Sequence, residues 1–239
     1  MKVIDILNNT LANVTKNMHS TRKKSLFSCI ESALSGASST VTSIGRGIRS
    51  NAYEKHNIKR ADRLLSNKNL NSDSITIYKS IAKTLIAPGS RPIILVDWSD
   101  LDPYKCNFLI RATLAMNGRG LTVYEEVHCI KHKEKPQTHK RFLQSLAKVI
   151  DASCEPVIVT DAGFKVPWFK QVQAVGWDFV GRTRLPNTYS LDGLNWPSIK
   201  SLYEKATTQP KSFSGFITKS NPLAVNLSLY KENLKAEKT

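Results

Sequence analysis

The chain has 239 residues, of which 41% are hydrophobic and 23% are charged. This composition is typical of a folded globular protein and excludes an acidic disordered tail, a collagen-like repeat and a disulfide-stapled miniprotein. No apolar run reaches the roughly 18–20 residues that a membrane span requires. The N-terminal segment, Met1 to Met18, lacks the charged-then-apolar pattern of an export signal. We therefore expect a cytoplasmic protein with no membrane partner.

The charge balance points to a polyanionic partner. Lys and Arg number 35 against 19 Asp and Glu, which gives a net charge of +16. A chain this basic most often binds nucleic acid. The excess is distributed along the whole chain, because residues 1–90 carry +9 and residues 91–239 carry +7. The alternative is a basic surface that serves only solubility.

The first third of the chain has the hydrophobic spacing of helices. Ile4, Leu7, Leu11 and Val14 recur at helical intervals, and Gly36 is a suitable helix stop. Further helices are predicted over residues 26–34, 41–48, 52–65 and 72–86. Because the Ala-Pro-Gly sequence at 87–89 interrupts this pattern, we predict a helical domain of residues 1–88.

Beyond Pro92 the pattern becomes that of an α/β domain. The continuous apolar run at residues 93–96 is typical of a central strand covered on both faces. Further strands are predicted at 107–116, 121–127, 157–161 and 178–183, and helices at 138–150 and 164–175. The Asn-Gly-Arg-Gly turn at 117–120 predicts a hairpin. We therefore expect a mixed five-stranded sheet in residues 89–184, followed by a weaker β pattern at 213–218 and 224–230.

Two of the predicted strands end in an aspartate, Asp97 and Asp161. Because ligands gather beyond the carboxyl ends of parallel strands, the two side chains should converge if the strands are neighbours. Two carboxylates this close repel each other unless a proton or a cation intervenes. Mg²⁺ fits such oxygen ligands, with Mn²⁺ as an alternative, and a metal pair can clamp a phosphodiester. The competing interpretation is a helix N-cap or a turn residue.

A second group of candidate residues is basic. The segment 46–63 carries seven such side chains, and on a helix Lys59 and Arg63 share one face with Lys55 and His56 a turn earlier. We expect this face to contact DNA phosphates; the alternative is a solvated helix face. The seven residues are Arg46, Arg49, Lys55, His56, Lys59, Arg60 and Arg63. Arg182 and Arg184, at the end of the last core strand, are further phosphate-binding candidates.

Around the two aspartates the sequence resembles a known family. Val-Asp-Trp-Ser-Asp at 96–100 and Thr-Asp-Ala-Gly-Phe at 160–164 resemble the first two catalytic motifs of bacterial DDE transposases of the insertion-sequence-four family. Residues 55–65 and 161–168 are also similar to members of this family, and the resemblance covers essentially the whole chain.

The resemblance implies a fold, a chemistry and partners. The fold would be a ribonuclease-H-like catalytic core preceded by an all-α DNA-binding domain. Asp97 and Asp161 would be the first and second carboxylates of a two-Mg²⁺ site that hydrolyses and transfers DNA strands. The partners would be double-stranded DNA, as transposon ends and target, and a second copy or a full-length transposase in a synaptic dimer. The protein would be bacterial and associated with the nucleoid.

One family feature is missing from the sequence. The family's third carboxylate is a Glu in a Tyr-x2-Arg-x3-Glu-x6-Lys pattern, which no segment here matches. We therefore expect residues 185–239 to be the start of a β-rich insertion, and the chain to be a truncated, inactive copy. The alternatives are a non-catalytic DNA-binding fragment that inhibits a full-length transposase, and a small nuclease whose site is completed by Glu125 or Asp100.

The remaining candidates have simpler interpretations. The four cysteines, which are far apart in the sequence, are expected to be buried small side chains. Trp98, Trp168 and Trp177 are expected to pack in the core. A cluster of possible metal ligands lacks the spacing of a zinc site and is expected to be a polar strand end that leads into a loop. Its members are His128, Cys129, His132 and His139.

Overall fold

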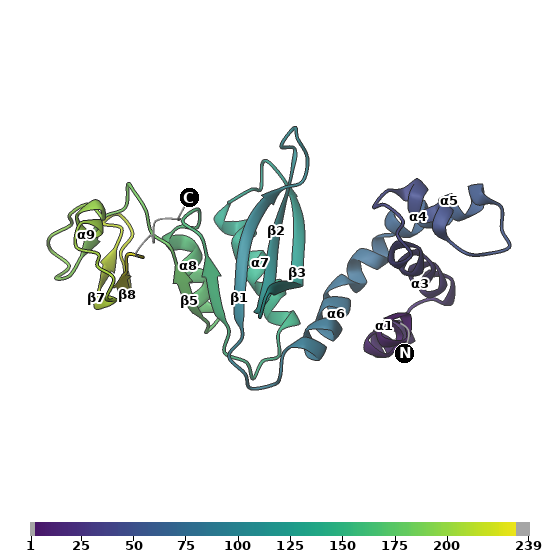
Figure 1. Ribbon diagram of the computed structural model, residues 1–239, viewed down its shortest axis with the longest axis horizontal. Coiled ribbons are helices and arrows are strands. Elements are labelled where there is room, and N and C mark those ends of the chain that lie inside the picture. Colours follow the sequence, from purple (N-terminus) through teal and green to yellow (C-terminus); the bar gives the residue numbers. More distant parts are fainter. Residues whose placement is uncertain (1–2, 233–239) are drawn as a thin grey trace, which may run out of the picture. The chain divides into compact units, whose positions relative to one another are not determined.

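The computed structural model describes residues 3–232 (Figure 1). The chain forms two compact units. One contains the residues up to Ser90 together with Ser145–Cys154, and the other contains Arg91–Gln144 and the residues from Glu155 onward. Among the described residues, no helix is both long enough and apolar enough to cross a membrane.

The first unit is built from helices. The expected helix at 4–14 is divided in two. The last helix begins at Lys68 and not at residue 72, because the Asn67 side chain caps it by accepting a hydrogen bond from the Asn69 amide. The helices are α1 (Val3–Thr10), α2 (Ala12–Lys16), α3 (Ser20–Leu34), α4 (Val41–Gly47), α5 (Glu54–Leu65) and α6 (Lys68–Leu85).

A small core joins α3, α4 and α5. Buried side chains from α3, α5 and the loop after α4 form one cluster, Cys29, Ile48, Ala61 and Leu64, and partly buried side chains of α4 pack against it. Helices α4 and α5 approach so closely at Gly45 that a Cβ atom there would overlap the backbone of Ile58. The buried Asn57 side chain donates to the Ile48 carbonyl oxygen at 3.3 Å. This bond fixes the loop that sets the position of α5.

The second unit contains a mixed five-stranded sheet, as the sequence predicts. Its strands lie in the order β3-β2-β1-β4-β5; β1 is antiparallel to β2 and parallel to β4, and β4 is parallel to β5. The two strands that precede the candidate aspartates are therefore parallel neighbours. The strands are β1 (Ile93–Asp100), β2 (Asn107–Met116), β3 (Arg119–Cys129), β4 (Val157–Thr160) and β5 (Asp178–Gly181).

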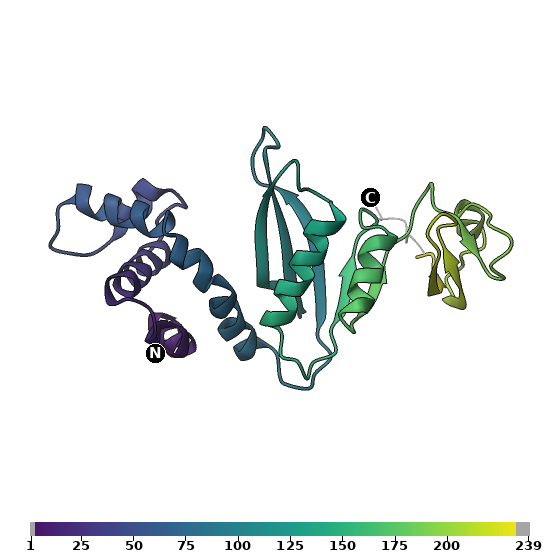
Figure 2. The ribbon, with the colours of Figure 1, turned by 180° about the vertical axis from the view of Figure 1, so that it is seen from behind.

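Two helices, α7 (Pro136–Val149) and α8 (Val166–Ala174), cover one face of this sheet (Figure 2). Ile94 and Val96 point to this covered face and are buried, whereas Ile93 and Leu95 on the other face are 50% and 42% exposed. The expectation of a central strand buried on both faces is therefore wrong. The other face, here called the open face, has no helix of the second unit's described residues in front of it (Figure 1).

Strand β1 is longer than the sequence predicts. It continues three residues beyond Asp97 to Asp100, because β2 pairs with it as far as Phe108. The parallel neighbour β4 ends earlier, at Thr160, after its last pair with Val96. Asp97 thus lies inside a strand, at the level where the parallel pairing stops.

A smaller antiparallel sheet follows, formed by β6 (Tyr189–Ser190), β7 (Lys211–Ile217) and β8 (Leu223–Leu229). The sequence predicts β7 and β8 but misses β6 and the one-turn helix α9 (Lys200–Tyr203). Residues 233–239 of the expected third segment lie outside the described residues.

The cysteines follow the expected burial only in part. Cys29 and Cys154 are buried, whereas Cys106 and Cys129 are exposed. The two exposed thiols lie where β2 begins and where β3 ends, and side chains at strand ends meet solvent more readily than those at strand centres.

Candidate functional site

Asp97 and Asp161 lie side by side at the end of the parallel pairing. Val96 of β1 pairs with Thr160 of β4. The residues that follow them, Asp97 and Asp161, therefore reach the open face, and neighbouring strands are about 4.8 Å apart. Both residues are exposed. Asp161 Oδ1 accepts a hydrogen bond from the Gly163 amide at 2.8 Å, so this residue also serves the turn. Among residues 3–232, Asp97 has no side-chain hydrogen bond or ion pair.

The two aspartates belong to a line of charges that crosses the open face. Arg111 of β2 is paired with Asp97, and Glu125 of β3 is paired with Arg111. On the other side, the pairing of Thr160 with Gly181 brings the next residue, Arg182, beside Asp161. We call these residues the charged row; in strand order they are Glu125, Arg111, Asp97, Asp161 and Arg182. Sequence reasoning missed Arg111, because only the strand register shows what lies opposite Asp97.

The aspartate pair fits a divalent cation. Mg²⁺ is commonly held by one or two carboxylates together with water and substrate phosphates, and the carboxylate of Asp97 is not engaged by any other described residue. Among the described residues, no three His, Cys, Asp or Glu side chains lie close enough to hold a metal ion. Asp100 points to the covered face and lies 3.6 Å from both Lys105 and Lys133. Glu125 is held by Arg111, so neither residue joins the pair.

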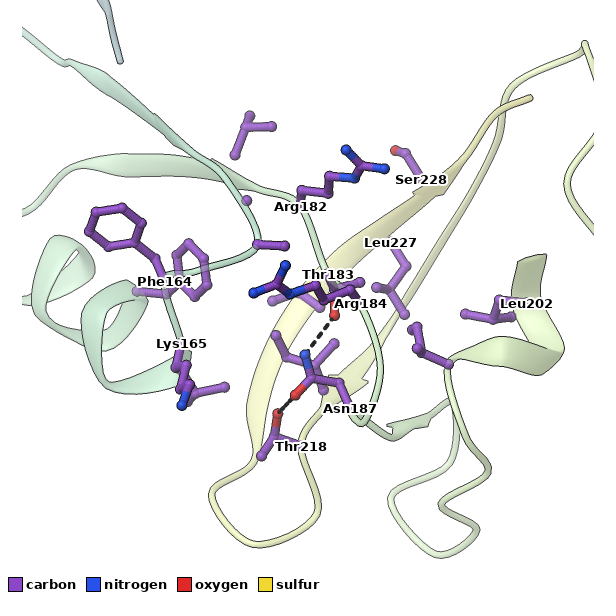
Figure 3. Close-up of a pocket in the computed structure, with 18 of the residues that line it drawn as sticks. Phe164, Lys165, Arg182, Thr183, Arg184, Asn187, Leu202, Thr218, Leu227 and Ser228 are labelled. Carbon is purple, nitrogen blue, oxygen red and sulfur yellow. Dashed lines mark hydrogen bonds between the residues drawn. The ribbon is translucent and has the colours of Figure 1, made fainter. Parts of the chain in front are cut away.

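A pocket of about 1280 Å³ begins beside Asp161 and extends to the smaller sheet. Its polar wall includes Lys165, Arg182 and Arg184 (Figure 3). The Asn187 amide donates to Thr183 Oγ1 at 3.1 Å and its oxygen accepts from Thr218 Oγ1 at 3.5 Å. These two bonds tie the loop after β5 to the end of β7. The basic side chains predicted at the end of β5 thus line a pocket next to one of the two aspartates.

The covered face beneath the aspartates is anchored by His139 of α7. Trp98 Nε1 donates a hydrogen bond to His139 Nε2 at 3.1 Å, and the imidazole stacks on Phe164. Burial lowers the pKa of His139 to about 4, and the nearby charge of His128 contributes less. The ring is therefore neutral at neutral pH, as an acceptor nitrogen requires. The sequence predicts packing for Trp98 but gives no signal for its partner.

The other members of the histidine and cysteine cluster form pairs. His128 Nε2 lies 2.8 Å from Glu126 Oε2. The other oxygen of this carboxylate, Oε1, accepts a hydrogen bond from the Tyr124 hydroxyl at 2.6 Å. Cys129 Sγ lies 3.6 Å from His132 Nδ1. These residues form the polar strand end that the sequence predicts.

Helix α5 gathers four of the predicted basic residues on its exposed surface, which we call the α5 face: Lys55, His56, Lys59 and Arg63. Arg49 is exposed in the preceding loop. Arg46 Nε is bound to Glu54 Oε1 at 2.9 Å. Arg60 is only half-exposed and lines a depression with residues of α1 and α3, so it does not belong to the α5 face.

Comparison of the chain with protein-family models, curated proteins and solved structures found no match.

Proposed function

We propose that this chain is a DNA-binding protein of the DDE-transposase type, with a ribonuclease-H-like core in its second unit. The observation that carries the proposal is that Asp97 and Asp161 directly follow the last paired residues of two neighbouring parallel strands, with an arginine on each side. The strand order, with β1 central between an antiparallel hairpin and a parallel pair, supports the fold assignment. The motifs at 96–100 and 160–164 support the family assignment.

In this proposal Asp97 and Asp161 hold a divalent cation, Mg²⁺ or Mn²⁺. Such an ion polarises a phosphoryl oxygen and lowers the pKa of bound water in phosphodiester chemistry. Arg182 and Arg184 bind the DNA backbone that passes into the pocket, since guanidinium groups recognise phosphates through paired hydrogen bonds.

The helices of residues 3–85 would form an all-α DNA-binding domain. Helices α3, α4 and α5 share one core, and α5 follows α4 after a loop fixed by Asn57. This order is typical of helix-turn-helix modules, in which the second helix of the pair contacts DNA. The α5 face would then lie against the duplex, with Lys59 and Arg63 on phosphates.

A second candidate function is DNA binding without catalysis. Because neither Asp100 nor Glu125 joins the aspartate pair, Asp97 and Asp161 are the two carboxylates that residues 3–232 offer to the metal ions. A clamp on both the attacking and the leaving oxygen needs two well-held metals, so we expect DNA binding and weak Mg²⁺ or Mn²⁺ binding without cleavage. Such a chain could inhibit a full-length transposase by occupying transposon ends or by pairing with it in a synaptic dimer.

DNA binding is tested by fluorescence anisotropy of a labelled duplex at several salt concentrations. Affinity should fall steeply with salt, because basic residues release counterions from phosphates. Changing Lys59 and Arg63 together to Ala should weaken binding and reduce the salt slope by about two units at most. The control changes Lys200 and Lys205 to Ala, which removes the same charge from another surface. An equal loss of DNA affinity in both variants would mean that the α5 face contributes only through the net charge of the protein.

The aspartate pair is tested with Mn²⁺, whose binding is followed by electron paramagnetic resonance. Asp97→Asn and Asp161→Asn should each lower Mn²⁺ affinity. Asp178→Asn, at the opposite end of the sheet, should leave it unchanged. Cleavage is tested on a supercoiled plasmid that carries candidate ends, at millimolar Mg²⁺. Specific cleavage that disappears in Asp97→Ala would favour the catalytic function over the binding-only alternative.

A further inference from the structure

Arg111 is placed between two carboxylates of the charged row but is bound to only one of them. It is the paired residue of Asp97 on β1 and of Glu125 on β3. Its Nε atom donates to Glu125 Oε2 at 2.7 Å, whereas no ion pair among the described residues involves Asp97. Within the described residues, the guanidinium is thus paired with Glu125 and not with the candidate metal ligand.

This choice of partner matters for the chemistry of Asp97. Directly opposed side chains of antiparallel strands have Cβ atoms about 4.5–5.5 Å apart, so Arg111 could reach either neighbour. A guanidinium bound to Asp97 would compete with a cation for the same oxygens. Glu125 removes this competitor, because it offers Arg111 a carboxylate on the far side.

The held guanidinium also has donors that no residue of 3–232 engages. Arginine carries five N–H groups, and the bond to Glu125 engages Nε. The Arg111 and Glu125 side chains are 46% and 31% exposed, so a ligand lying on the open face can reach the terminal nitrogens. Arg182 occupies the corresponding place on the other side of the aspartates. A phosphodiester backbone laid along the charged row would meet a cation at each flank and the metal between them.

We propose that Glu125 is a positioning residue that holds Arg111 away from Asp97, and that Arg111 so held binds a backbone phosphate beside the metal. This inference rests on the proposed function, because it requires both a cation at the aspartates and a nucleic acid ligand. Both residues lie outside the two aspartate motifs.

The positioning role is tested by Mn²⁺ binding in the absence of DNA. Glu125→Ala releases Arg111 toward Asp97 and should lower Mn²⁺ affinity by roughly threefold to tenfold, the effect of one charge at a half-exposed site. Glu125→Gln removes the same negative charge but keeps an acceptor for Arg111 Nε. The loss of Mn²⁺ affinity in this variant should therefore be clearly smaller than in Glu125→Ala. The double variant Glu125→Ala/Arg111→Gln should recover the affinity, since the competitor is gone.

The phosphate-binding role is tested by DNA anisotropy on the same proteins. Arg111→Gln should weaken duplex binding and reduce the salt slope by about one unit, while its Mn²⁺ affinity stays equal or rises. A DNA affinity that falls while the Mn²⁺ affinity is kept or rises cannot come from partial unfolding, which would lower both. Arg119→Gln is the matched control, because Arg119 lies at the turn end of the same hairpin.

The outcomes separate this inference from the proposed function. Equal losses of Mn²⁺ affinity in Glu125→Ala and Glu125→Gln would overturn the positioning role. So would a double variant that does not recover the Mn²⁺ affinity. DNA binding by Arg111→Gln equal to that of the unchanged protein would overturn the phosphate contact while the proposed function stands. A wild-type protein that binds neither Mn²⁺ nor DNA would overturn both.

Discussion

The protonation of His139 should control the stability of the second unit below neutral pH. The imidazole is buried at the centre of an aromatic cluster, where Trp168 contacts it edge-on with ring centroids 5.0 Å apart. Its Nε2 atom accepts the Trp98 hydrogen bond, and a proton on that nitrogen would remove this bond. Burial therefore keeps the folded protein from binding the proton that an unfolded histidine accepts.

The size of the effect follows from the two pKa values. An unfolded histidine has a pKa of about 6.5, and His139 in the fold has a pKa of about 4. Because the unfolded state binds more protons between these values, the stabilisation is complete above pH 6.5 and decreases as the pH falls toward 4. The loss between pH 7 and pH 5 is about 2 kcal/mol, and its limit below pH 4 is about 3 kcal/mol.

The assay is urea unfolding followed by tryptophan fluorescence at pH 7 and pH 5. All four tryptophans belong to the second unit, so this signal follows that unit specifically. His139→Gln keeps an acceptor for Trp98 but does not titrate. Its unfolding free energy should therefore decrease between the two pH values by about 2 kcal/mol less than that of the unchanged protein. His56→Gln, an exposed histidine of α5, is the control.

Two results would refute this reasoning. One is the same pH dependence of the unfolding free energy in His139→Gln and in the unchanged protein. The other is an NMR titration in which the His139 ring protonates near pH 6.5 while the protein stays folded.

Three further predictions test the packing. Gly45→Ala should destabilise the first unit by about 1–3 kcal/mol, because the new Cβ overlaps α5, and thermal unfolding followed by helical circular dichroism measures this. Ile94→Ala should lower the free energy of unfolding in urea by about 2–5 kcal/mol, whereas Leu95→Ala should lower it by under about 1 kcal/mol. Only Ile94 points to the covered face, so equal losses of stability would contradict this assignment of faces. Cys29 and Cys154 should react with a thiol reagent far more slowly than the other two cysteines, since both are buried and burial raises the pKa of Cys29; four equal rates would contradict the fold.

Local spacing in the sequence is sufficient to predict the elements around the site. The apolar runs before Asp97 and Asp161 predict β1 and β4, and the turn at 117–120 predicts the hairpin that follows. These patterns arise within a few residues, because side-chain alternation in a strand and helical periodicity are properties of neighbouring positions. The same logic predicts that the two aspartates meet if their strands are adjacent.

The tertiary structure alone decides which side chains become partners. Arg111 is opposite Asp97 and bound to Glu125 only because β1, β2 and β3 pair in one particular register, and His139 meets Trp98 only because α7 lies on the covered face. Arg60 belongs to the same basic segment as Lys59, yet the packing of α5 turns it away from the α5 face. Contacts of this kind join residues far apart in the chain, and the register that brings them together is set by burial of the whole sheet face. The sequence by itself therefore determines the elements and the candidate carboxylates, whereas long-range packing determines the charges that surround them.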